Sequence, residues 1–160
     1  MMRWSELEKA APDLAMLTRE RFDATELVMM GTLRKNGWPR ISPIEYTFWD
    51  SDLLFGGIWQ SKKFLDIQRD NRVTVHSTAA NKNGQEGDAK LYGRLSPLAE
   101  ERIEPYWQHI FEQINWRPKG PSHVFTLGID SASYVRFTEE GMMEWLKWPG
   151  EGWQRRKSVD

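Results

Sequence analysis

The chain has 160 residues, of which 39% are hydrophobic and 28% charged, and its formal net charge at pH 7 is −1. This length suits one ordinary domain, so we expect a single domain over residues 1–160. The near-neutral charge argues against nucleic acid as a partner, because nucleic-acid binders carry a basic surface. No apolar run approaches the roughly 20 residues of a membrane span, so no membrane partner is expected. Without cysteine the chain cannot form disulfides, and we expect a cytoplasmic protein.

The first 24 residues predict a helical N-terminal extension. Ser5 and Glu8 have the spacing of a capping box, in which each side chain satisfies a backbone N–H near the other. Leu7, Leu14 and neighbouring apolar residues continue at helical spacing. Pro12 interrupts the pattern, so we expect two short helices at about 5–10 and 12–21.

The pattern then changes to alternating residues that predict strands. Asn36-Gly37 is the favoured pair for a tight hairpin turn. The strand that follows contains Pro39 and Pro43, which cannot donate to a ladder, so it should lie at a sheet edge or be irregular. A third strand at 53–59 contains Gly56 and Gly57, and paired glycines in a strand indicate close approach by a backbone or a ligand.

The rest of the chain alternates between predicted strands and two helices. A short amphipathic helix is expected at 61–69, and a longer one starting at Ser96-Pro97, with Pro105 breaking or kinking it near its start. Strands are expected at 71–78, 89–96, 123–131, 133–138, 142–148 and 152–156. Strands at this spacing predict a mainly β fold with flanking helices, a closed or nearly closed barrel.

Several familiar kinds of catalytic chemistry are missing from the sequence. The three histidines form neither an HExxH pair nor a metal cluster, so no metal is expected. There is no Gly-x-Ser-x-Gly elbow, no GxGxxG and no P-loop. If the chain is an enzyme, its reactive chemistry therefore belongs to a bound cofactor, and no catalytic side chain is assigned.

The start of the predicted helix at 61–69 is unusual in its charge. Ser61 has the character of an N-cap, but the first turn holds Lys62 and Lys63, each costing roughly 0.3–1 kcal/mol beside the positive end of the helix dipole. One interpretation is an anion site, in which a phosphate meets these groups and the free N–H groups. The other is a solvated helix surface, with Asp66 four residues from Lys62.

The segment "LLFGGIWQSKKFLDIQRDNRVTVH", with "TLRKNGWPRISPIEYTFWD" before it and "DAKLYGRLSPL" after it, resembles the pyridoxamine 5′-phosphate oxidase-like proteins, the flavin-binding split β-barrels. The C-terminal "GMMEWLKWPGEGWQRR" is similar to the endings of shorter members of the family. The resemblance covers residues 25–155, and it implies a split β-barrel with inserted helices over that range.

The resemblance also implies a cofactor site. Lys62 and Lys63, helped by Ser61, would hold a cofactor phosphate. Asp88 stands where many relatives have a glutamine against the flavin ring, and this departure leaves the cofactor's identity open. The implied cofactor-binding residues are Arg40, Ile41, Ser42, Gly56, Gly57, Ser61, Lys62, Lys63, Asp88, Trp145 and Trp148.

Family members are usually homodimers with the cofactor at the subunit interface, so Trp145, Trp148 or Arg155 would complete the partner's site. The expected cofactor is FMN, with a deazaflavin coenzyme as the alternative and haem a third type in the family. The implied function is a flavin-dependent oxidoreductase that transfers hydride or electrons to or from a small organic substrate. Vitamin B6 oxidation is not expected, because the C-terminal substrate-binding region has no match here. The alternative is a non-catalytic flavin or haem carrier.

Overall fold

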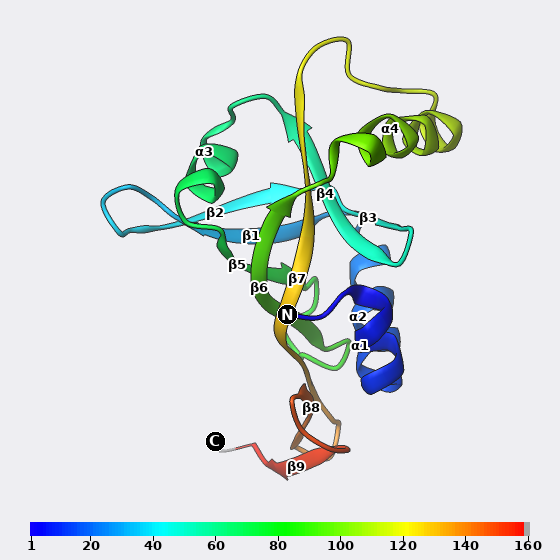
Figure 1. Cartoon of the computed structure of the whole chain (residues 1–160). Helices are drawn as coiled ribbons and strands as arrows, with labels where there is room; N and C mark the ends of the chain where they lie inside the picture. Colours follow the sequence, from blue (N-terminus) through cyan, green and yellow to red (C-terminus); the bar gives the residue numbers. More distant parts are fainter. Residues whose placement is uncertain (159–160) are drawn as a thin grey trace.

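The computed structural model describes residues 1–158, which fold around one antiparallel sheet (Figure 1). Its strands follow the order β2-β1-β5-β6-β7-β4-β3, with β8 paired to β7 and β9 paired to β8. The strands are β1 (Val28–Leu33), β2 (Pro39–Ile44), β3 (Thr47–Trp49), β4 (Asp52–Ile58), β5 (Arg72–Ser77), β6 (Asp88–Pro97), β7 (Ser122–Phe137), β8 (Met142–Trp148) and β9 (Gln154–Lys157).

The long strand β7 is where the sheet divides. Its first residues pair with β4 over Ser122–Thr126, and its last residues pair with β8 over Ala132–Phe137, while β6 follows nearly its whole length. The sheet curls without closing, because β2 and β3 at its two ends do not pair with each other. This is the split β-barrel that the sequence predicted, with helices on its flanks.

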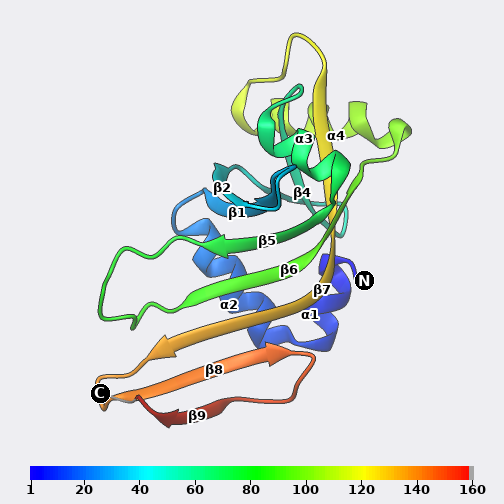
Figure 2. The same ribbon diagram turned by 90° about the vertical axis from the view of Figure 1, so that its left-hand side faces the viewer.

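Four helices flank the sheet at separate places. Helices α1 and α2 lie behind β5 to β8 when the sheet is viewed as in Figure 2, and α3 and α4 lie toward its other end. None of the helices in the described part of the chain is long and apolar enough to cross a membrane. The helices are α1 (Trp4–Ala10), α2 (Pro12–Asp23), α3 (Lys62–Arg69) and α4 (Glu100–Ile114).

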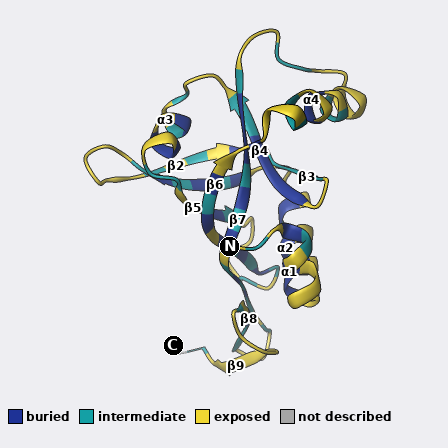
Figure 3. Ribbon diagram, in the orientation of Figure 1, coloured by how far each residue is buried: buried dark blue, intermediate teal, exposed yellow. Residues whose placement is uncertain are grey.

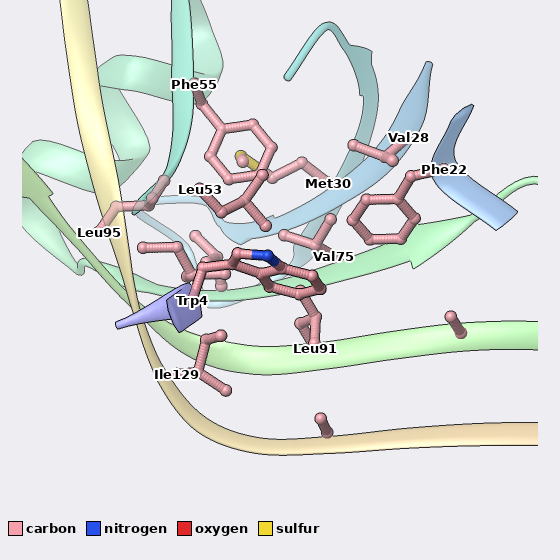
Figure 4. Close-up of a cluster of buried hydrophobic side chains, with 14 of the residues drawn as sticks. Trp4, Phe22, Val28, Met30, Leu53, Phe55, Val75, Leu91, Leu95 and Ile129 are labelled. Atoms are coloured by element: carbon pink, nitrogen blue, oxygen red, sulfur yellow. The ribbon is translucent and has the colours of Figure 1, made fainter. Parts of the chain in front are cut away.

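The main core fills the space between the curled sheet and α1 and α2 (Figure 4). Alternation along each strand sends every second side chain inward, so Val73 and Val75 of β5 and Ala89 and Leu91 of β6 are buried. Trp4 and Phe22 come from the two N-terminal helices, and they show that these helices complete the core. By contrast β9 is exposed along its whole length (Figure 3).

A second apolar cluster fixes α4 against the opposite side of β4. Tyr106 and Trp107 of α4 are 3% and 6% exposed and pack with Leu54 and Val124. This cluster places α4 over β4, on the right of Figure 1.

Two of the four predicted helix starts require correction. Helix α1 begins at Trp4, and its capping box uses the Arg3 backbone N–H, which donates to the Glu6 carboxylate at 2.6 Å, in place of Ser5 and Glu8. Ser96 and Pro97 belong to β6, and α4 begins at Glu100. The cap-then-proline pattern was misleading because a proline is equally acceptable at a strand end.

Three further predictions about where elements break require correction. Pro105 does not break α4, which runs from Glu100 to Ile114. The two strands predicted at 123–131 and 133–138 form one strand, β7, over Ser122–Phe137. The strand predicted after the Asn36-Gly37 turn is divided into two strands, because β2 ends at Ile44 and β3 starts at Thr47.

A buried carboxylate ties the N-terminus to α4. Asp52 at the start of β4 is 3% exposed, and it accepts hydrogen bonds from the Arg3 guanidinium at 2.7 and 2.9 Å and from Arg102 at 2.9 Å. Burial works to raise the pKa of Asp52, but the hydrogen bonds from the two arginines outweigh it and lower that pKa. The carboxylate is therefore held charged by partners from α4 and from the residue before α1.

The Asp52→Asn variant should lose about 1–3 kcal/mol of unfolding free energy, because two guanidinium groups lose the buried negative charge and one of its two acceptor oxygens. Asp50→Asn is the matched control, since Asp50 also accepts from Arg102 but its side chain is 57% exposed, and it should cost at most about 1 kcal/mol. Urea unfolding followed by tryptophan fluorescence measures both. Equal losses in the two variants would contradict a role for Asp52 burial.

Candidate functional site

The predicted helix at 61–69 is present as α3, and a buried carboxylate docks it to the sheet. Asp66 is 4% exposed and accepts from Arg40 Nε of β2 at 2.6 Å, Thr32 Oγ1 of β1 at 3.0 Å and Arg69 at 3.3 Å. Its burial works to raise the pKa, but the hydrogen bonds from Arg40, Thr32 and Arg69 lower it. Asp66 therefore turns toward the sheet and holds α3 beside β2, and it does not pair with Lys62.

The polar side chains at the start of α3 have few hydrogen-bond partners within the chain. Ser61 is the N-cap residue, yet its side chain makes no capping hydrogen bond, and its buried Oγ has no partner within residues 1–158. Lys63 lies against the edge of β2, where its ammonium group donates to the Pro43 carbonyl at 3.1 Å. Partial burial lowers the pKa of Lys63.

The electrostatics of this turn favour an anion. No carboxylate of the described chain forms an ion pair with Lys62 or Lys63, and no acidic residue occupies the first turn of α3. Lys62 is exposed, while Lys63 is partly withdrawn from water. The donor set of a helix start, a partnerless hydroxyl and two ammonium groups suits a phosphate.

The free edge of β2 lies next to this turn. Lys63 reaches the Pro43 carbonyl, so the backbone groups of Pro43 face away from β1. Backbone direction alternates along a strand, so Pro39 and Ile41 share this orientation. Because prolines have no N–H, Ile41 alone of these three keeps a donor toward the free edge, and its side chain is 71% exposed. The side chains of Arg40 and Ser42 share one face of β2, and on that face Arg40 contacts Asp66 of α3.

The paired glycines of β4 leave room for aromatic side chains of the same chain. A Cβ at Gly56 would lie 3.1 Å from the Tyr106 hydroxyl and 3.2 Å from the Trp107 ring. A Cβ at Gly57 would lie 2.8 Å from the ring of Phe64 in α3. The groups that approach the glycines are therefore side chains of α3 and α4, whereas the sequence predicted a backbone or a ligand.

A cavity of about 550 Å³ adjoins both glycines and extends between α4 and α2. Its wall includes Glu45 and Thr47, which follow directly after β2. Sequence reasoning missed this cavity, because its residues come from four separated segments and form no motif. Its aromatic and imidazole rings are those of Tyr46, Phe48, Tyr106, Trp107, His109 and Trp116.

Asp88 and Trp145 lie together, away from α3. Asp88 of β6 pairs with Val135 of β7, and Val135 pairs with Trp145 of β8, so the three side chains share the uncovered face of the sheet. Asp88 bonds Lys90 and lies 3.4 Å from His76 Nε2. The hydrogen bond with His76 lowers the pKa of Asp88 to about 2 and raises that of His76.

Asp88 and Trp145 lie far from the start of α3 within the same chain. Pro43, Met29, His76 and Lys90 are neighbours across β2, β1, β5 and β6, which places Lys90 about 14 Å from Pro43 along the sheet. Strand β8 lies two strands beyond β6, and α3 and β8 stand at opposite ends in Figures 1 and 2.

Trp148 differs from Trp145 in orientation. It pairs with buried Ala132 and packs against the main core, on the sheet face opposite to Trp145. The structure therefore brings Arg40 of β2 to α3 through Asp66 and brings Lys63 to Pro43 of the same strand. It places Gly56 and Gly57 in β4, the strand before α3, and it separates Asp88, Trp145 and Trp148 from the start of α3.

The comparisons with known proteins agree with this architecture. The family model for pyridoxamine 5′-phosphate oxidase matches residues 17–136, well over half of the chain. The chain belongs to the pyridoxamine 5′-phosphate oxidase family, as the resemblance predicted. No curated protein matches the chain significantly.

Solved structures share the fold at low sequence identity. PhzG from Burkholderia lata, in complex with tetrahydrophenazine-1-carboxylic acid, is 13% identical with a TM-score of 0.66, over 93% of this chain and 94% of that one. A protein related to general stress protein 26, from Clostridium acetobutylicum, is 15% identical with a TM-score of 0.63, over 84% and 94%. A FAD-binding protein from Mesorhizobium loti is 17% identical with a TM-score of 0.56, over 75% and 90%.

The contribution of Asp66 to stability should depend on pH. Its folded-state pKa lies below the ordinary value of 3.8, so the stabilisation is complete above that value and is lost as the pH falls through the folded pKa. Asp66→Asn should therefore cost about 1–3 kcal/mol at neutral pH. The difference from the unsubstituted chain should shrink below about pH 4. Urea unfolding across this range measures it, and a pH-independent difference would contradict the assignment.

Proposed function

We propose that the chain binds a flavin and acts as an oxidoreductase on a small organic substrate. The observation that carries the proposal is the start of α3, where the buried Ser61 hydroxyl has no partner and Lys63 is partly buried without a carboxylate. The cavity beside Gly56 and Gly57 adds room for a planar group along β4, the strand that leads into α3. Membership of a family with flavin-binding relatives supports the same conclusion.

Each residue of the anchor has a distinct task in this proposal. Lys63 and the N–H groups of the first turn bind the phosphate, and Ser61 gains its missing hydrogen-bond partner. Arg40 stays bonded to Asp66 and so positions α3, while Ile41 offers its N–H to the ring edge. The chemistry that a bound flavin supplies is hydride or electron transfer.

FMN is the first choice of cofactor, because the anchor suits one terminal phosphate. The deazaflavin coenzyme remains the alternative, since Lys62 is exposed and free to meet a longer acidic tail. One structural relative is a FAD-binding protein, so a dinucleotide is a third ligand to test.

We also propose a homodimer in which two chains complete each site. Trp145 and Asp88 cannot join the anchor of their own chain, because about 14 Å or more of sheet lies between them. The face that carries them is not covered by α1 and α2 in Figure 2. A second chain would bring its Asp88 and Trp145 to the anchor of the first.

The anchor is tested by comparing FMN with riboflavin, which lacks the phosphate. Lys63→Gln should weaken FMN binding roughly 10- to 100-fold, the value of a charge-assisted hydrogen bond, and leave riboflavin nearly unchanged. Ser61→Ala should have a smaller effect in the same direction, because its hydroxyl is neutral. Quenching of flavin fluorescence on titration measures each dissociation constant.

Lys35→Gln is the matched control, since Lys35 is an exposed lysine in the turn between β1 and β2. It should leave both ligands unaffected, and circular dichroism should report an intact fold in every variant. If Lys63→Gln weakened FMN and riboflavin equally, or neither, the phosphate anchor would be wrong. Mass spectrometry of the ligand that co-purifies with the native protein separates FMN from the deazaflavin.

The shared site is tested with mixed dimers of Lys63→Gln and Trp145→Ala chains carrying different affinity tags. Each variant should bind FMN poorly as a homodimer, because both of its sites are damaged. The mixed dimer contains one site with both residues intact, so it should hold about half of the normal FMN when the two act across the interface. Absorbance of the purified mixed dimer gives the ratio of flavin to protein.

Three results would contradict the shared site. A mixed dimer as poor in FMN as both parents would place Trp145 in the site of its own chain. Normal FMN binding by the Trp145→Ala homodimer would remove Trp145 from the site. A monomeric protein in analytical ultracentrifugation would exclude an interface of any kind.

A further inference from the structure

We propose that the cavity between α4 and α2 selects a planar aromatic substrate that is cationic and rejects its anionic analogues. This inference rests on the proposed function, because it names the substrate class of the same site. It depends on three features of the cavity: its rings, its charges and its position beside the glycine pair.

The size and the rings of the cavity suit a flat aromatic molecule. A volume of about 550 Å³ lies within the usual range for small-molecule sites. Tyr46 and Phe48 line the cavity together with Tyr106 and Trp107 of α4. Tyr46 and Phe48 pack against the main core, whereas Tyr106 and Trp107 belong to the cluster that holds α4, so the two groups of rings come from different parts of the wall. Such walls offer stacking surfaces to a planar ligand.

The charges that line the cavity are mostly negative. Asp23, Glu26 and Glu45 contribute three carboxylates, against the single guanidinium of Arg19. Arg19 is itself engaged, since it lies over the Phe48 ring at 4.4 Å and 3.9 Å from the Asp23 carboxylate. A cation therefore gains attraction here, and it also interacts favourably with the ring faces. An anion meets repulsion from the same carboxylates.

The two tyrosines remain neutral hydrogen-bonding groups. Burial raises the pKa of Tyr46, which donates to Asp23 Oδ1 at 2.7 Å, and the nearby Asp23 and Glu26 carboxylates raise it further. Burial also raises the pKa of Tyr106, where Glu45 acts in the same direction. Neither tyrosine therefore adds a negative charge, and Arg19 is the one arginine or lysine among the cavity residues of the described chain.

Trp107 gives a second, independent sign of a ligand. It lines the cavity and is 6% exposed, yet its indole Nε1 has no acceptor in the described part of the chain. A buried donor without a partner is costly, and a ligand with an acceptor would supply that partner. The substrate class that we infer is therefore an aromatic cation that also carries a neutral acceptor for the Trp107 indole N–H.

The cavity lies where a substrate would meet the flavin. Gly56 and Gly57 form part of its wall, and the first turn of α3 follows β4 after a short connection. The anionic tail of a flavin and a cationic substrate would then occupy regions of opposite charge. In agreement with this arrangement, Lys62 and Lys63 do not line the cavity that carries the carboxylates.

The test uses two probes of similar size with isothermal titration calorimetry. They are 3-carbamoyl-1-methylquinolinium, a cation with a neutral carbonyl acceptor, and quinoline-3-carboxylate, an anion. The cation should bind at least about threefold more tightly than the anion. Glu45→Gln should weaken the cation about two- to fivefold and strengthen the anion by a similar factor. Glu112→Gln is the control, because Glu112 lies on α4 but outside the cavity, and it should change neither affinity.

The titrations are made on the flavin-free protein and repeated after FMN loading. Equal affinities for both probes, or a preference for the anion, would overturn the proposal. Loss of selectivity in Glu112→Gln as well as in Glu45→Gln would also overturn it, because the carboxylates of the cavity would then not be its source. Cation selectivity in a protein that fails to bind FMN would support the cavity and count against the flavin.

Discussion

The buried Asp66 carboxylate is the interaction on which the candidate site depends. It accepts from Arg40 on β2, Thr32 on β1 and Arg69 on its own helix, so it connects α3 to two strands at once. A charge this deeply buried is tolerated only with such partners, and removing one partner leaves it uncompensated. The position of α3, and with it the position of every group in its first turn, therefore follows from this carboxylate.

The docking of α3 determines which partners remain for the two lysines in its first turn. Lysines at a helix start oppose the helix dipole, and the usual remedy is an acidic neighbour. The nearest candidate, Asp66, is committed to the sheet, and Lys63 is drawn to a carbonyl at the edge of β2. The positive charge and the Ser61 hydroxyl therefore keep no carboxylate or hydrogen-bond partner within the described chain. Under the proposed function, a bound phosphate would offset this local cost.

The sequence predicted the fold class and most strands because period-two patterns and turn pairs are local signals. The Asn36-Gly37 turn, the edge strand with its two prolines and α3 all belong to this kind. It misplaced the start of α4, since a proline after serine suits a strand end as well as a helix start. It missed the role of Asp66 and the cavity, because these depend on contacts between distant segments. It also did not separate Trp145 from Trp148, whose faces are set by register.

The same glycine-bearing strand connects two regions of opposite charge. On one side of β4 the first turn of α3 presents lysines, and on the other the groove between α4 and α2 presents carboxylates among aromatic rings. Gly56 and Gly57 permit this arrangement, because any side chain there would collide with Tyr106, Trp107 or Phe64. Under the proposed function, an anionic tail would be held at one end and repelled from the other, and this polarity would orient the flavin before a substrate enters.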